Sequence, residues 1–158
     1  MLLHRKPHAA RAIAHLAVIV LGALWITAGG AALAPQAEAA TLVARVDLSS
    51  QRMQVFVDGR KRFTWRVSTG RRGWRTPAGT YQPWAMKPRL YSKRFRMQLS
   101  HVIWIDTTGI AIHGTTRMSR LGRTASHGCI RLALGNARTF YRMVKQHGLW
   151  NTSVVVHR

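Results

Sequence analysis

Residues 126–132 read Ser-His-Gly-Cys-Ile-Arg-Leu and contain Cys129, the only cysteine of the 158-residue chain. A second histidine, His113, stands upstream. Attack by sulfur requires a thiolate, and an unperturbed cysteine is only a few per cent ionised at neutral pH. Positive neighbours stabilise a thiolate, so His127, Arg131 and Arg123 are expected to contribute to a lower pKa of Cys129. A small buried hydrophobe is the alternative role for a lone cysteine, but the two histidines favour a nucleophile.

The beginning of the chain has the composition of an export signal. Three basic residues precede an apolar run over 17–34, which the Ala-Glu-Ala sequence at 37–39 follows. This order is typical of a secretory signal peptide. We expect residues 1–39 to be the signal peptide and residues 40–158 to form one domain in the periplasm or cell envelope. An uncleaved anchor is the alternative, because the apolar run is near the lower limit for spanning a bilayer.

The charge of the chain favours anionic partners. Residues 40–158 hold 22 basic residues and three acids, a formal charge of +19. The basic residues occur in every segment, and no helix-turn-helix, zinc-finger or ribonucleoprotein pattern accompanies them, so nucleic acid is not the expected partner. For an exported protein the available anions are cell-wall polymers, peptide carboxylates and lipid headgroups. We therefore expect an anionic cell-wall surface as the partner.

The few acidic residues argue against several kinds of enzyme. Beyond the signal segment the acids are Asp47, Asp58 and Asp106, and at least two of them stand in turn sequences rather than in the carboxylate pair of a glycosidase. The histidines and the cysteine match no common zinc spacing, so neither a metal nor another cofactor is expected. Ser126 lacks the Gly-x-Ser-x-Gly pattern of a serine hydrolase.

Hydrophobic alternation predicts a mainly β domain. Strands are expected over residues 42–48, 54–57, 63–67, 101–105, 110–113 and 154–156. Apolar residues at helical spacing predict one helix over 134–147, which Gly148 ends. Residues 85–98 are basic and aromatic with no clear period, and an ordered surface loop is expected there. The tryptophans Trp65, Trp84 and Trp104 are expected in the core.

The chain resembles the L,D-transpeptidase catalytic domain of the YkuD family. The similarity runs from about Leu42 to Val156 and is weakest over residues 87–100. The resemblance implies a compact β-sandwich or barrel-like fold with one packed helix. The motifs that carry it are Ser126–Leu132, His113–Thr115, Leu121–Arg123, Val67–Gly70 and Thr76–Tyr81.

The resemblance also implies catalytic roles for Cys129 and His113. Cys129 would attack the carbonyl of an L,D-linked peptide in a peptidoglycan stem. His113 would act as the general base, oriented by the backbone carbonyl of Gly114. Backbone N–H groups around Gly128 and Cys129 would form the oxyanion hole.

Three further residues receive roles from the same resemblance. His127 would shape the pocket, and Ser126 and Arg131 would bind substrate. Arg131 is suited to pair with a substrate carboxylate. A structural ion pair is the alternative role for Arg131, although the chain offers few acids for one.

The implied reaction has two halves. Attack on a tetrapeptide donor would release D-alanine and leave a thioester on Cys129, and an amine of a neighbouring stem would then form a 3→3 cross-link. Water, a free D-amino acid or a protein amine would give carboxypeptidase, exchange or tethering activity instead. A carbapenem is expected to acylate Cys129. A non-catalytic wall-binding module and a basic nucleic-acid binder are the alternatives from other classes.

Overall fold

The computed structural model describes residues 41–158, so the predicted signal peptide lies outside the described part of the chain. Among these residues no helix is long and apolar enough to cross a membrane. Nine strands, one short 3-10 helix and one α-helix follow in chain order. They are β1 (Leu42–Asp47), β2 (Arg52–Val57), β3 (Arg60–Arg66), β4 (Gly79–Tyr81), β5 (Ala85–Ser92), β6 (Met97–Trp104), β7 (Ala111–Thr115), η1 (Met118–Arg120), β8 (Ile130–Ala133), α1 (Leu134–His147) and β9 (Thr152–His157).

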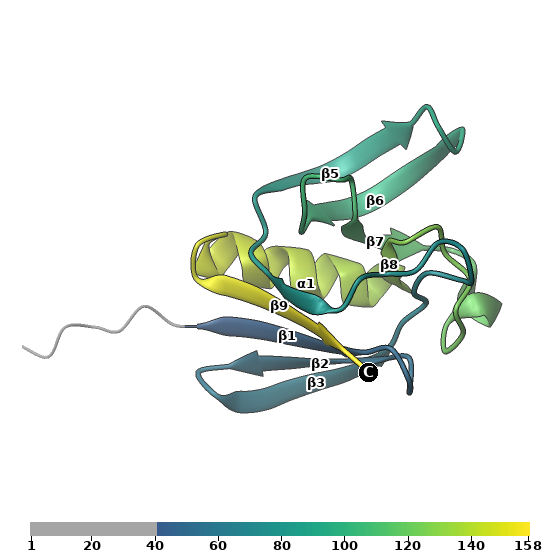
Figure 1. The fold of residues 1–158 in the computed structure, drawn as a ribbon. Helices are drawn as coiled ribbons and strands as arrows, with labels where there is room; N and C mark the ends of the chain where they lie inside the picture. Colours follow the sequence, from purple (N-terminus) through teal and green to yellow (C-terminus); the bar gives the residue numbers. More distant parts are fainter. Residues whose placement is uncertain (1–40) are drawn as a thin grey trace, which may run out of the picture. The chain divides into compact units, whose positions relative to one another are not determined.

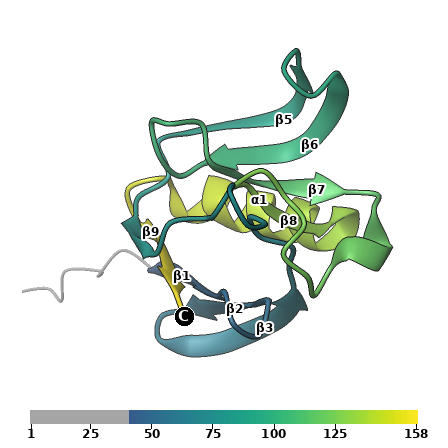
Figure 2. The same cartoon turned by 45° about the vertical axis from the view of Figure 1, so that its right-hand side comes forward.

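The strands form two sheets, as the mainly β prediction requires. One sheet has the order β3-β2-β1-β9-β4 and the other β5-β6-β7-β8. In Figures 1 and 2 the helix α1 lies between the two sheets. The β1 strand pairs in parallel with β9, and β7 pairs in parallel with β8. The predicted fold class, a mainly β domain with one packed helix, is confirmed.

The core lies between the helix and the two sheets, and several elements bury one regular face in it. In β1 the alternate residues Leu42, Ala44 and Val46 are buried, as a period of two requires. In α1 the buried side chains recur at helical spacing, with Phe140 at the centre. Gly148 ends the helix with a positive φ of 86°, which a glycine adopts readily. The predicted helix bounds agree with those of α1.

The predicted surface loop over 85–98 is wrong. Most of this segment forms β5 and the start of β6, which pair as an antiparallel hairpin. In Figure 1 the tip of the hairpin projects away from α1, and β5 is partly or fully exposed throughout. An exposed edge strand needs no apolar alternation and tolerates Pro88, so neither usual strand signal is present.

The tryptophans only partly follow the prediction. Trp65 and Trp104 are half-buried and pack against core residues. Trp84 is 57% exposed, and its indole N–H donates to the backbone carbonyl of Asp106. Core packing is therefore wrong for Trp84.

Candidate active site

The parallel register of β7 and β8 brings the motif residues together. Ile112 lies opposite Ile130, and His113 lies opposite Arg131. Both isoleucines are buried in the main core. Successive side chains point to opposite faces of a strand, so His113 and Arg131 share the other face. Cys129 immediately precedes β8 and joins them around one cavity.

This cavity has a volume of about 420 Å³. Its polar wall contains His113, Arg117, His127, Cys129 and Arg131. Apolar side chains from the β5–β6 hairpin form much of the remaining lining. A cavity of this size, in which polar groups converge beside apolar side chains, is typical of a ligand site.

The imidazole of His113 is buried and has a defined orientation. Its Nδ1 lies 2.9 Å from the carbonyl oxygen of Gly114, the contact that the resemblance predicts. A carbonyl can only accept, so Nδ1 carries the proton and Nε2 of the neutral ring is left as an acceptor. Burial lowers the pKa of His113, and the charge on Arg131 adds to this, whereas the Gly114 contact opposes it. The ring is therefore neutral at neutral pH and able to take a proton.

Gly114 has a second role in the packing of β7. A Cβ at this position would lie 3.0 Å from a methyl carbon of Leu134 and 3.3 Å from the carbonyl oxygen of Ser100. The glycine thus allows β7 to approach both α1 and β6 closely.

The pKa of the Cys129 thiol differs from the expectation. The Sγ atom lies 3.8 Å from the carbonyl oxygen of Gly109, toward which it donates. Burial raises the pKa of the thiol, and this exceeds the opposing effects of the Ala111 backbone and the Arg131 charge. The predicted lowering of the pKa is therefore wrong. Removing the thiolate from water costs more free energy than its attraction to the nearby positive charge recovers.

The hydroxyl of Ser126 holds the loop that carries the cysteine. Ser126 is fully buried and does not line the cavity. Its Oγ accepts from the backbone N–H of Gly128 at 3.1 Å and donates to the carbonyl of Cys129 at 2.5 Å. We therefore assign Ser126 to loop positioning in place of the predicted substrate contact. The N–H of Gly128, predicted as an oxyanion donor, is already used by Ser126.

A buried threonine, to which the sequence assigned no role of its own, ties a second loop to Gly128. The hydroxyl of Thr76 accepts from the N–H of Gly70 at 2.9 Å and donates to the carbonyl of Gly128 at 2.7 Å. Gly128 has φ of 107°, which a glycine adopts readily. Gly70 is needed for space, because a Cβ there would collide with the carbonyl oxygen of Trp74. Gly70 and Thr76 each lie in a motif that matches the family, and this match was the sequence evidence that could have pointed to them.

Gln51 is a further positioning residue, and no sequence pattern pointed to it. Its side-chain amide donates to Thr69 Oγ1 at 2.6 Å, and its Oε1 accepts from the N–H of Thr69 at 2.9 Å. The carbonyl of Thr69 in turn accepts from the N–H groups of Ala125 and Ser126, each at 2.9 Å. The cysteine loop is thus held directly by the segments of Thr69 and Thr76, and Gln51 acts on it through Thr69.

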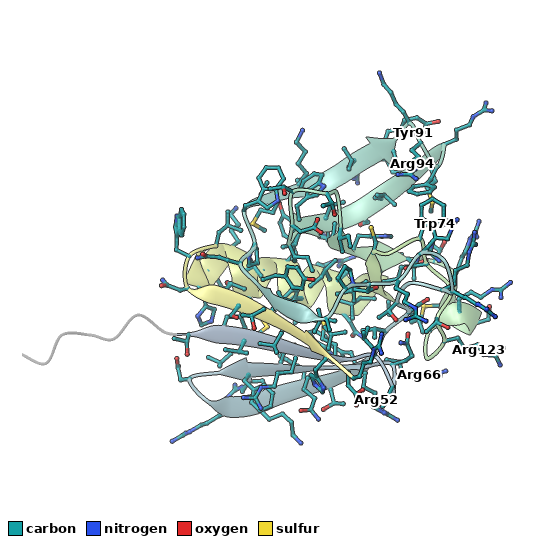
Figure 3. All side chains as sticks on the ribbon, in the orientation of Figure 1. Arg52, Arg66, Trp74, Tyr91, Arg94 and Arg123 are labelled. Atoms are coloured by element: carbon teal, nitrogen blue, oxygen red, sulfur yellow. The ribbon has the colours of Figure 1, made fainter. Side chains whose placement is uncertain are left out.

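His127 contacts an aromatic cluster at the rim of the cavity. Its ring centroid lies 5.1 Å from that of Trp74 and 5.0 Å from that of Phe95. The guanidinium of Arg94 lies 5.1 Å from the Trp74 ring and 5.4 Å from the Phe95 ring, and Figure 3 labels Arg94 and Trp74. The cluster joins the tip of the β5–β6 hairpin to the cysteine loop. Local burial lowers the pKa of His127, and Arg71 adds to this.

The half-buried guanidinium of Arg131 also faces the cavity. It donates to the carbonyl of Ala125 at 3.3 Å. Burial lowers the pKa of Arg131, and Arg117 lowers it further. Arg117 and Arg131 leave the cavity positive. Within residues 41–158 no group of three or more His, Cys, Asp or Glu side chains is placed to hold a metal ion.

Comparisons with known proteins give a consistent result. The sequence model of the L,D-transpeptidase catalytic domain, YkuD, matches residues 42–156. No curated protein matches the chain. Among solved structures, an L,D-transpeptidase from Mycobacterium smegmatis has a TM-score of 0.70 at 23% identity, over 75% of this chain and 59% of that one.

Two other solved structures resemble the chain to a similar degree. L,D-transpeptidase 3 from Mycobacterium tuberculosis, in complex with a faropenem-derived adduct, has a TM-score of 0.67 at 21% identity, over 75% of this chain and 61% of that one. An L,D-transpeptidase from Stackebrandtia nassauensis has a TM-score of 0.66 at 25% identity, over 75% and 56%. The aligned part covers about three fifths of each of these chains. Because the family match extends over most of the sequence, the chain belongs to the L,D-transpeptidase catalytic domain (YkuD) family.

Proposed function

We propose that this protein is a peptidoglycan L,D-transpeptidase that forms 3→3 cross-links through a thioester on Cys129. One observation carries the proposal. The only thiol of the chain and a buried imidazole of defined tautomer line the same cavity. The family membership and the relative with a faropenem-derived adduct support acyl transfer at this cavity.

The proposed first half-reaction begins with two neutral groups. As Sγ of Cys129 attacks the carbonyl carbon of the donor stem, Nε2 of His113 takes the thiol proton. The carbonyl oxygen becomes an oxyanion, for which we propose the backbone N–H of Cys129 as a donor. Collapse of this intermediate breaks the C–N bond to D-alanine, and His113 returns the proton to the leaving amine.

The second half-reaction reverses this sequence with a new amine. The amine of a neighbouring stem attacks the thioester, loses a proton to His113 and forms the amide of the cross-link, while the thiol is regenerated. Arg117 and Arg131 supply positive charge for the carboxylates of the stems. We further propose that the domain acts outside the inner membrane after export by residues 1–39.

Mass spectrometry after incubation with a carbapenem tests the proposal. The wild-type chain is expected to gain one covalent adduct, and Cys129→Ala is expected to gain none. With disaccharide tetrapeptide as substrate, Cys129→Ser is expected to lose nearly all 3→3 product, because a serine alkoxide is harder to form with the same base. Near-normal product from Cys129→Ser would contradict the proposal. Product analysis of the wild type separates cross-linking from hydrolysis and D-amino-acid exchange.

A further inference from the structure

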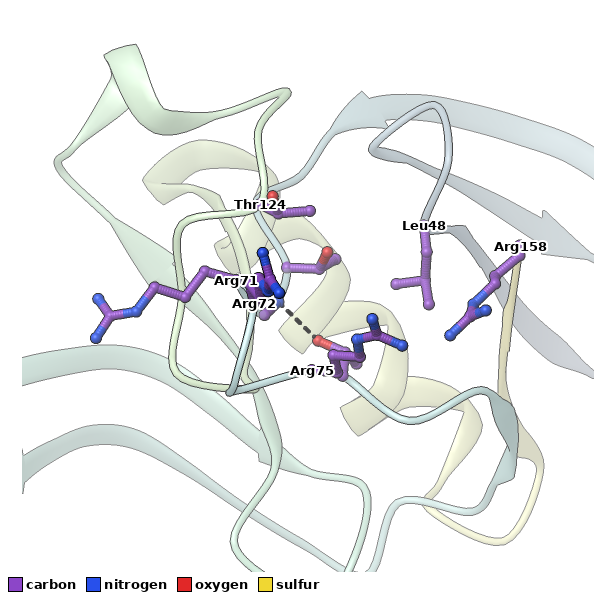
Figure 4. Close-up of a pocket in the computed structure, with 9 residues that line it drawn as sticks. Leu48, Arg71, Arg72, Arg75, Thr124 and Arg158 are labelled. Atoms are coloured by element: carbon purple, nitrogen blue, oxygen red, sulfur yellow. Dashed lines mark hydrogen bonds between the residues drawn. The ribbon is translucent and has the colours of Figure 1, made fainter.

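A second cavity lies beside the loop that precedes Thr76. It has a volume of about 340 Å³ and is shown in Figure 4. Four arginines and no aspartate or glutamate are among the residues that line it. In the figure the side chains of Arg75 and Arg158 extend toward one another beneath Leu48. The other two arginines are Arg71 and Arg72.

The protein itself does not neutralise this group of charges. Residues 41–158 contain only three acids, and each accepts hydrogen bonds from its own turn or from the residue before β1. Asp47 accepts from Ser49 and Ser50. Asp58 accepts from the N–H of Thr41, and Asp106 accepts from Thr108 and Ile110. The four arginines around the second cavity are exposed and have no aspartate or glutamate among them, so an anion bound there would be attracted by their combined charge.

The chemistry of the lining favours a phosphate group. Each arginine presents a planar fork of N–H donors and holds its charge at all physiological pH values. A carboxylate carries one charge and pairs best with one such fork. A phosphate monoester carries about −1.5 to −2 charges at pH 7, and its three terminal oxygens can accept from several guanidinium groups at once. Several arginine forks around one cavity match the phosphate better.

The second cavity shares its wall with the cysteine loop. The N–H of Arg71 donates to the carbonyl of Ser126 at 3.1 Å, and the Thr76 hydroxyl bonds both Gly70 and Gly128. The dashed line in Figure 4 marks the contact between Gly70 and Thr76. A ligand at this cavity thus contacts the segment that holds Cys129 in place.

We propose that the cavity lined by Arg71, Arg72, Arg75 and Arg158 binds a phosphate group, separately from the site around Cys129. The phosphate can belong to a soluble molecule or to a lipid headgroup. The proposal goes beyond acyl transfer and does not depend on it. None of these arginines lines the cavity of Cys129, although the charge of Arg71 acts on His127 at its rim.

Calorimetric titration of the full chain with inorganic pyrophosphate tests the proposal, with sodium chloride at equal ionic strength as the blank. Saturable binding at one site is expected. The double variant Arg72→Gln/Arg158→Gln is expected to bind about tenfold more weakly or worse, because two charge-assisted contacts are lost. Arg60→Gln/Arg62→Gln removes the same charge from the exposed strand β3 and is expected to change the affinity less than about twofold.

Two further measurements complete the test. Cys129→Ala is expected to bind pyrophosphate like the wild type, so failure of the phosphate site and failure of the proposed thioester chemistry are distinguishable. Phosphatidylcholine vesicles that contain phosphatidic acid identify the source. The phosphate belongs to a lipid headgroup if pyrophosphate displaces the wild-type chain from these vesicles and Arg72→Gln/Arg158→Gln, but not Arg60→Gln/Arg62→Gln, binds them weakly. Otherwise the phosphate belongs to a soluble or polymer-borne molecule.

Two results would overturn the proposal. One is the absence of saturable pyrophosphate binding by the wild type. The other is an equal loss of affinity in the two double variants, which would make the attraction a property of the net charge alone. Loss of the folded state does not explain weak binding if the circular dichroism spectrum of Arg72→Gln/Arg158→Gln matches that of the wild type.

Discussion

The thiol of Cys129 and the imidazole of His113 are shifted in opposite directions by one cause. Burial disfavours the charged form of each group, so it raises the pKa of the thiol and lowers the pKa of the imidazole. At neutral pH both groups are therefore uncharged. Such a pair stays unreactive toward solvent and forms a thiolate only when the imidazole takes the proton during attack.

A pH series of thiol alkylation tests this arrangement at the residue scale. His113→Gln keeps a side chain of similar length but removes the base, so we expect alkylation of Cys129 by iodoacetamide at pH 7 to fall about tenfold or more. Since the pKa of the thiol is raised, only alkaline solution then forms the thiolate, and the rate is expected to recover partly toward pH 9. His157→Ala, at an exposed position, is the control. An unchanged pH profile in His113→Gln would show that His113 does not assist ionisation.

At the scale of elements, the site depends on segments that hydrogen bonds tie to one another. The Thr76 hydroxyl bonds a donor of one loop and an acceptor of another, and both bonds are buried. Thr76→Val keeps the shape but leaves the Gly70 N–H and the Gly128 carbonyl unpaired. We expect a loss of about 2 kcal/mol or more in the free energy of unfolding, measured by urea denaturation. We also expect slower acylation of Cys129 by a carbapenem.

An exposed threonine supplies the control for this change. Thr80→Val alters β4, where the side chain is exposed, and it is expected to change the stability by less than about 0.5 kcal/mol. Equal stabilities of Thr76→Val and the wild type would show that water replaces both hydrogen bonds.

The β5–β6 hairpin contributes to the site through its tip. Phe95 contacts His127, and the tip residues line the cavity of Cys129. Phe95→Ala is expected to slow carbapenem acylation several-fold, because one wall of the cavity is lost. The loss of stability is expected to stay near 1 kcal/mol, since the ring is 39% exposed. Tyr91→Ala, on the same hairpin and 58% exposed, is the control and is expected to acylate at the wild-type rate.

An equal effect of the two substitutions would contradict the specific role of the hairpin tip. Faster acylation of Phe95→Ala would show instead that the phenyl ring hinders access of the substrate.

At the scale of the whole molecule, the dominant property is the charge. Residues 40–158 hold 22 basic residues against three acids, and the basic residues are spread over most of the elements. Exposed charges attract an anionic polymer over distances of about 8 Å at physiological ionic strength, and added salt shortens this range. The attraction therefore acts on retention at a surface rather than on bond-making within a cavity.

A salt series separates these two contributions. We expect sedimentation with purified sacculi to fall steeply between low and moderate salt, whereas turnover of a small soluble tetrapeptide changes little. Sacculi stripped of bound protein provide the anionic surface, and neutral cellulose is the control surface. Binding that persists in high salt would show that shape or apolar contacts hold the protein to the wall. A parallel fall of both quantities would place the basic surface within the active site, where Arg131 is the first residue to examine.

The sequence by itself determined most of the fold class and the membership of the site. Alternation of apolar residues predicted β1 and β9, and apolar residues at helical spacing predicted α1, because each of these elements buries one regular face. The family resemblance that the motifs around Cys129 and His113 carry implied that these two residues act together, and they line one cavity. The apolar periodicity and the motifs each lie within a short segment, so both can be recognised in the sequence.

Only the tertiary structure decided the rest, because it depends on contacts between distant segments. The β5–β6 hairpin has no buried face over most of β5, and hence no period that would distinguish it from a loop. Ser126 is a positioning residue because it is buried beneath its own loop, and Thr76 joins that loop from 52 residues away. The thiol pKa of Cys129 is raised because burial outweighs the charges that stand next to it in the sequence.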